Sequence, residues 1–140
     1  MISEIRSYFK LVINEVDSDL KQHNRYFISD DIADTNKEDR YHLYIGNVDT
    51  NRQDIDMNSV FAISLKFWKN GDSDEIEKID KAYCNAILMQ LKLMDKKRIT
   101  QSEFIKSVDG TSIEIEPSIN NDNLAEFTLQ FNITVGYKSF

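Results

Sequence analysis

The feature that most constrains the fold is a strict two-residue alternation over residues 124–137, which read LAEFTLQFNITVGY. From residue 127 onward its odd positions are apolar, and the even positions between them are polar. β-Branched and aromatic residues with this period are typical of a strand that has one face on a hydrophobic core. At ~3.3 Å per residue the strand would be about 40 Å long, so it needs partner strands along its length. The rest of the chain is expected to supply a sheet and a helical cover for one of its faces.

Three further segments are predicted to be strands. Residues 41–48 and 60–69 carry apolar side chains at every second position, and residues 111–119 do so after Asp109-Gly110. That dipeptide is typical of a two-residue hairpin turn, so we expect the chain to reverse there. The side chains expected on the core face are Leu43, Ile45, Phe61, Ile63, Leu65, Phe67, Ile113, Ile115, Phe127, Leu129, Phe131 and Ile133.

Residues 2–21 have apolar side chains at 3.6-residue spacing, which predicts an amphipathic helix. Leu11 lies off the apolar face of this helix, beside Lys10 and Asn14. It is either an isolated exposed leucine, which is common on protein surfaces, or a residue that contacts a partner.

A second helix is predicted to begin near Asp72, because Asp72 and Glu75 fit a capping box, and to run to about Met94. Leu88 and Met89 lie off its core stripe, in a segment that is apolar nearly all round the helix. Such a segment is covered on more than one side. Either the first helix covers Leu88 and Met89 within the subunit, which we favour for Met89, or they contact a neighbouring subunit, as the position of Leu88 nearly opposite the core stripe indicates. The core stripe is expected to contain Ile76, Ile79, Tyr83, Ala86, Ile87 and Met94.

The connections between these elements differ in character. Residues 22–40 are polar and rich in turn formers, which predicts a surface loop, although residues 25–28 could form a short strand. Residues 95–108 are ambiguous, because Thr100 and Glu103 could cap a short helix. Residues 49–59 form a long hairpin loop, and long loops often make contacts. The candidate contact residues in that loop are Asp49, Arg52, Asp54 and Asp56.

The composition limits the functions that the chain can have. Its 140 residues fit a single domain, residues 1–140, and a net charge of −7 argues against nonspecific binding to DNA. No apolar run approaches the ~20 residues needed to cross a bilayer, and the N-terminus does not resemble a signal peptide. A single cysteine, Cys84, excludes an intrachain disulfide; we expect it to be buried as a small apolar residue.

No pattern of catalytic or metal-binding residues emerges. His23 and His42 have no further ligands at zinc spacing, and residues 49–60 lack the glycine and the final carboxylate of an EF-hand loop. Phosphate-binding loops, nucleophile elbows and HExxH helices do not occur. The sequence therefore predicts a protein that is not an enzyme and has no cofactor or metal ion.

The order of elements resembles the tail terminator proteins of long-tailed bacteriophages. Three stretches carry the likeness: residues 41–48 (YHLYIGNV), residues 61–94 (a strand ending in FWKNGD and a long helix), and residues 124–137, which open with LAE and close with ITVGY. The resemblance implies an α+β fold in which two main helices pack on one face of an antiparallel sheet of about four strands, in the order α-β-β-α-β-β. Related head–tail joining and tail-completion proteins share similar folds.

The resemblance also implies a function. Proteins of this family form a ring, usually a hexamer, that ends the tail tube and joins it to the head. The implied partners are further copies of the chain, the tail tube protein and a head-completion or connector protein, while DNA passes through the ring. The implied location is the head–tail junction of the virion, and the host cytoplasm during assembly. The alternative is a small cytoplasmic adaptor or ligand-binding module, since one fold hosts many functions.

Overall fold

A computed structural model describes residues 2–22, 38–50, 58–70, 76–117 and 124–136. Within these residues the chain forms three helices and five strands. In chain order they are α1 (Ile2–Val16), β1 (Lys21–Gln22), β2 (Arg40–Thr50), β3 (Ser59–Asn70), α2 (Ile76–Leu93), α3 (Lys96–Gln101), β4 (Ile105–Pro117) and β5 (Leu124–Val135).

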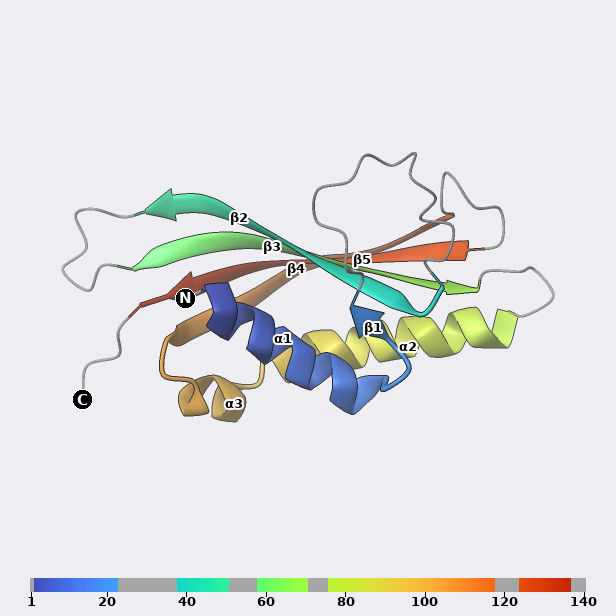
Figure 1. Ribbon diagram of the computed structural model, residues 1–140, viewed down its shortest axis with the longest axis horizontal. Helices are drawn as coiled ribbons and strands as arrows, with labels where there is room; N and C mark the ends of the chain where they lie inside the picture. Colours follow the sequence, from blue (N-terminus) through green and yellow to red (C-terminus); the bar gives the residue numbers. More distant parts are fainter. Residues whose placement is uncertain (1, 23–37, 51–57, 71–75, 118–123, 137–140) are drawn as a thin grey trace.

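The strands form one sheet in the order β1-β2-β3-β5-β4, and the helices lie on one face of it (Figure 1). The pairs β2–β3, β3–β5 and β5–β4 are antiparallel, whereas β1 pairs with β2 in parallel. The predicted α+β fold is thus confirmed. The sheet is mixed and has five strands in place of about four antiparallel ones, because Lys21 and Gln22 form β1; α3 is also additional.

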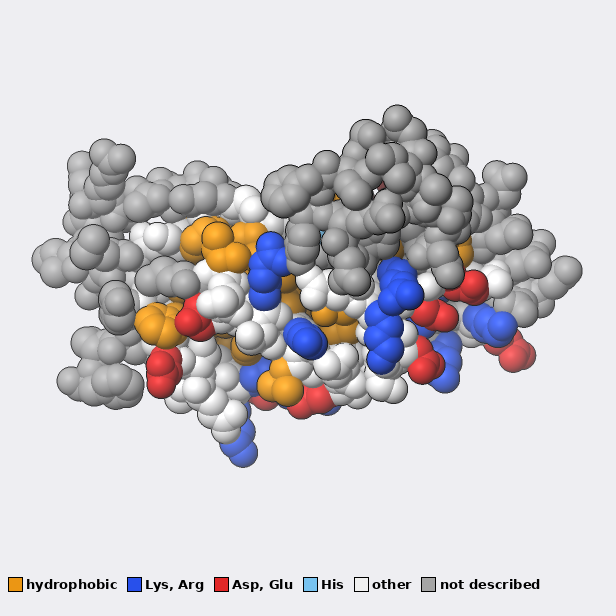
Figure 2. Space-filling model, viewed as in Figure 1, with side chains coloured by type: hydrophobic (Ala, Val, Ile, Leu, Met, Phe, Trp, Pro, Cys, Tyr) orange, Lys and Arg blue, Asp and Glu red, His pale blue; other side chains and the backbone are white. Residues whose placement is uncertain are grey.

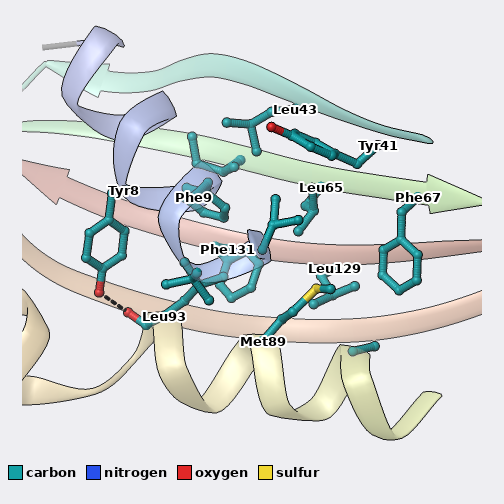
Figure 3. Packing of buried hydrophobic residues seen from close by; sticks show 14 of the residues in the cluster. Tyr8, Phe9, Tyr41, Leu43, Leu65, Phe67, Met89, Leu93, Leu129 and Phe131 are labelled. Atoms are coloured by element: carbon teal, nitrogen blue, oxygen red, sulfur yellow. Dashed lines mark hydrogen bonds between the residues drawn. The ribbon is translucent and has the colours of Figure 1, made fainter. Parts of the chain in front are cut away.

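The long alternating strand lies inside the sheet, as its length required. β5 pairs over its whole length with β3 on one side and with β4 on the other. Phe127, Leu129 and Phe131 are at most 1% exposed. Leu129 and Phe131 lie on the side of the sheet that carries the helices (Figure 3). The ring of Phe131 meets Phe9 of α1 edge-on, with 5.5 Å between the ring centres. The alternation predicted this face correctly because a shift by one residue would turn it to solvent.

The first helix is shorter than predicted. α1 ends at Val16, and Asp17 then accepts a hydrogen bond from the backbone N–H of Asp19 at its own Oδ1 atom. This local bond competes with helix continuation, as is common for aspartate. Leu20 remains buried although it lies outside the helix, whereas Ile2 is 49% exposed, contrary to its predicted place on the core face.

The second helix is rotated from the predicted orientation. Its buried side chains are Ala82, Ala86, Met89 and Leu93, at 4-3-4 spacing. Of the predicted core stripe only Ala86 is fully buried; Tyr83 and Met94 are 41% and 37% exposed. The two alanines present a flat inner side, so the helix can lie close to the sheet. The expectation of a buried Cys84 was wrong, because this rotation leaves Cys84 exposed.

The segment before the fourth strand resolves the ambiguity over residues 95–108. Asp95 caps α3 by accepting a hydrogen bond from the N–H of Lys97 at 3.3 Å, so the cap is neither Thr100 nor a residue beyond it. The predicted hairpin at Asp109-Gly110 was wrong. Both residues lie within β4, where Gly110 pairs with Phe131. The glycine is required by packing, since a Cβ atom there would lie 2.5 Å from Nε2 of Gln90 on α2.

Candidate assembly surface

The side of α2 that faces away from the core is apolar over its C-terminal half. Cys84, Ile87, Leu91 and Met94 recur at 3-4-3 spacing, and we call these four residues the outer seam. Such spacing places side chains in one line along a helix, as on the contact side of a coiled coil. Leu91 is 62% exposed and is the most exposed large apolar residue in the described part of the chain. Leu88, at 42% exposure, widens the same stripe.

The apolar surface continues from α2 to the edge of the sheet. β4 is the outermost strand on this side, and its Ile115 is 41% exposed although it pairs with the fully buried Phe127. Met94 and Gln90 lie directly above Gly110 of β4. At this edge of the domain, both the helix layer (α2) and the sheet (β4) therefore have apolar side chains that are exposed. Exposed apolar patches rimmed by polar residues are typical of protein contact sites.

The opposite end of the two-layer structure is closed. There β1 lies beside β2, and Leu20, Tyr41 and Leu43 are at most 5% exposed. The core side chains at the β2 side are thus covered, whereas Ile115 at the β4 side is partly exposed. This asymmetry gives the domain two edges of different chemical character.

Polar contacts fix the orientation of α2 and with it the direction of the outer seam. The phenol of Tyr8 on α1 donates a 2.6 Å hydrogen bond to the carbonyl of Leu93, the last residue of α2 (Figure 3). Burial raises the pKa of Tyr8 to about 12; the charge of Arg98 lowers it somewhat and that of Asp95 raises it. The bond ties α1 to the end of α2, where both helices meet α3.

A second contact joins the same elements on the surface. Arg98 Nη2 of α3 donates a 2.6 Å hydrogen bond to Glu15 Oε2 of α1, and Lys92 Nζ of α2 lies 3.5 Å from that oxygen. Desolvation acts to raise the pKa of Glu15, but the two cations outweigh it and hold the pKa below its usual value. Because these groups are partly exposed, the contact adds little to the free energy of unfolding. Its main effect is to fix the positions of α1, α2 and α3 relative to one another.

A hollow in the described surface lies elsewhere, where α1 ends and β3 reaches α2. It is a cleft of about 490 Å³, and Lys69 stands in its wall. Lys69 Nζ lies 2.7 Å from Asp17 Oδ2 and 2.8 Å from Asp39 Oδ1. Burial lowers the pKa of Lys69, yet the two carboxylates outweigh it and leave the pKa raised. Lys69 and the two carboxylates thus neutralise one another within the chain. A ligand in the cleft would meet positive and negative charge together.

The structure places the predicted contact residues in different situations. Leu11 and Leu88 are exposed, at 56% and 42%. Met89 is fully buried against the sheet, as expected if elements of its own subunit cover it, so it cannot also form a surface contact (Figure 3). Asp49 belongs to β2 and not to a loop, because the strand continues to Thr50 through a bulge. Arg52, Asp54 and Asp56 lie outside the described residues.

Of the members of this surface, sequence reasoning singled out only Leu88. It placed Ile87, Met94 and Ile115 in the core, expected Cys84 to be buried, and did not single out Leu91. The outer seam could have been found from its heptad spacing, because the core side of α2 has a separate 4-3-4 pattern. Ile115 could not, since alternation places it on the core face and only the end of the helical cover exposes it.

In the described residues, no group of three or more His, Cys, Asp or Glu side chains is arranged to hold a metal ion. No helix in the same residues is long and apolar enough to span a membrane. The chain matches no model of a protein family, and no curated protein is significantly similar to it in sequence.

Proposed function

We propose that this protein is a non-enzymatic structural subunit of a bacteriophage tail, which assembles into a ring at the head–tail junction. The observation that carries the proposal is the outer seam of α2 with the adjacent β4 edge, an apolar surface that one subunit leaves uncovered. A monomeric protein rarely exposes a continuous apolar stripe of this kind, because burying it gains about 25 cal/mol per Å². Assembly supplies the missing cover.

The α+β fold, the long alternating strand and the acidic balance support the same proposal. They accord with the resemblance of residues 41–48, 61–94 and 124–137 to tail terminator proteins. In the proposed ring an acidic wall would be an advantage, since like charge lets duplex DNA pass without binding. The proposed partners are further copies of the chain, six in one ring, a tail tube protein and a head-completion protein.

The test is the assembly state of the purified chain. Sedimentation velocity and negative-stain microscopy should show closed rings with a central channel. Leu91→Glu should abolish the rings while the melting temperature stays near that of the wild type, because Leu91 is mostly exposed within the subunit. Gln101→Glu, which adds the same charge at an exposed position of α3, is the matched control and should still assemble. A wild-type chain that stays monomeric at high concentration would refute the proposal.

A second candidate function is a ligand-binding module, and the cleft beside Lys69 is the observation that favours it. Lys78, Lys81 and Asn85 complete its wall, so a small molecule with both acidic and basic groups would fit its mixed charge. Thermal-shift measurements with a set of zwitterionic and anionic metabolites would test it. A stable monomer whose melting temperature rises with one of them, and does not rise in Lys81→Ala, would favour this function over the ring.

A further inference from the structure

We infer that the β4 edge of one subunit docks on the β2 edge of the next copy of the chain, head to tail. This inference rests on the proposed ring and names the two surfaces that would form it. Its basis is the different chemistry of the two edges and the way in which the strand pairings of the sheet align them. A contact between two different surfaces of the same chain generates a ring when the rotation closes.

The direction of the strands permits this docking. Successive antiparallel pairs make β2 and β5 run one way, and β3 and β4 the other. A neighbour that keeps the same orientation in a ring therefore presents its β2 antiparallel to β4. β1 accompanies β2 only at Arg40 and Tyr41, so most of β2 has no further strand beside it in the described part of the sheet.

The charges of the two edges are complementary. The β4 edge has a net negative charge, with Asp109, Glu114 and Glu116 against Lys106 on the strand beside the apolar surface. One row across the sheet begins at Lys21 and passes through β2, β3 and β5 to Glu116 of β4. If the sheet continues without a shift, Glu116 of one copy meets Lys21 of the next, an opposite-charge pair across neighbouring strands. That row is Lys21, Arg40, Trp68, Glu126 and Glu116.

The helical layer agrees with the sheet. Tyr8 of α1 faces α2, and Lys10, two residues further on, lies about 200° round the helix, on the side away from α2. Lys10 is exposed and thus adds positive charge on the β2 side of the helix layer. On the face that carries α1, hydrophobic side chains form small separate patches among charged ones (Figure 2). Asp19 and Glu38 also lie on this side, at the cleft that Lys78 and Lys81 line.

Two charge-reversal variants test the inference: Glu114→Lys/Glu116→Lys at the β4 edge and Lys10→Glu/Lys21→Glu at the β2 edge. All four side chains are exposed, so both variants should keep the wild-type melting temperature and circular dichroism. Each variant alone should sediment as a monomer at concentrations where the wild type forms rings. An equimolar mixture should restore rings in which the variants alternate, because every contact then pairs opposite charges. Lys96→Glu/Lys97→Glu, on α3, is the control and should assemble alone.

The outcomes separate the failure of this inference from the failure of the ring itself. If both variants form rings on their own, the docking surfaces lie elsewhere while the ring proposal stands. Dimers of Lys10→Glu/Lys21→Glu alone would instead indicate symmetric pairing through β4 and overturn the head-to-tail contact. If the wild type forms no ring under any condition, the proposed function fails together with the inference.

Discussion

The hydrogen bond from Tyr8 to the end of α2 makes a sharp prediction for alkaline conditions. The pKa of Tyr8 is raised to about 12 in the folded chain, against an ordinary value of 10.0 for tyrosine. Between these pH values the unfolded chain loses the phenol proton while the folded chain keeps it, so stability falls as pH rises. Two pH units at about 1.36 kcal/mol each give a loss of about 2.7 kcal/mol that is complete near pH 12. Below pH 10 this group has no effect on the pH dependence.

Tyr8→Phe separates this effect from other titrations. At pH 7 the variant should be less stable than the wild type by about 0.5–1.5 kcal/mol, because the hydrogen bond to the Leu93 carbonyl is lost. Above pH 11 the difference should vanish or reverse, since phenylalanine does not ionise. Urea titrations at pH 7, 9 and 11.5, followed by circular dichroism, give the free energy of unfolding of both proteins. They therefore measure the deficit at pH 7 and its disappearance at alkaline pH. Tyr83→Phe, on the exposed side of α2, is the control for losing a hydroxyl. An equal deficit of Tyr8→Phe at all three pH values would contradict the reasoning.

The core and the α2–β4 contact give further predictions, measurable by denaturant unfolding. Phe131→Ala should cost about 3–5 kcal/mol because the side chain is 1% exposed, whereas Asn132→Ala on the solvent side should cost about 0.5 kcal/mol or less. A double-mutant cycle of Phe9 and Phe131 should show about 0.5–1.5 kcal/mol of coupling from their edge-on rings, and additive losses would argue against that contact. Gly110→Ala should cost about 1–3 kcal/mol, since its Cβ would lie 2.5 Å from Gln90, and Gln90→Ala should relieve much of that cost.

The sheet could be predicted from the sequence because a two-residue period specifies which face of a strand is buried. Phe127, Leu129 and Phe131 illustrate this, since no other register keeps all three from water. The orientation of α2 could not be predicted in the same way. Residues 86–94 read AILMQLKLM, which is apolar on nearly every side, so the period gives no single direction. Contacts with the sheet and α1 select the side that carries Met89.

The turn predicted from local sequence was wrong where a tertiary contact determined the conformation of the chain. Asp109-Gly110 has the composition of a hairpin turn, yet the glycine serves the close approach of Gln90 to β4. β1 has two residues, too few for any pattern, and exists because Lys21 and Gln22 follow the end of α1 alongside β2. For the candidate surface, Leu88 was predicted to be exposed from its place off the core stripe, while Leu91 required knowledge of the helix rotation.

The two unlike edges of the domain also bear on how large the assembly can grow. Strands in a sheet are rotated by about 20–25° relative to their neighbours, so a sheet continued from β4 to the next β2 cannot stay flat. The helices occupy only one face of each subunit, and their bulk therefore bends successive copies away from that side. A head-to-tail contact with a constant bend closes after a fixed number of copies, whereas an added rise per subunit would give an open filament. The number of subunits in a closed ring thus reports the angle between the β4 and β2 edges.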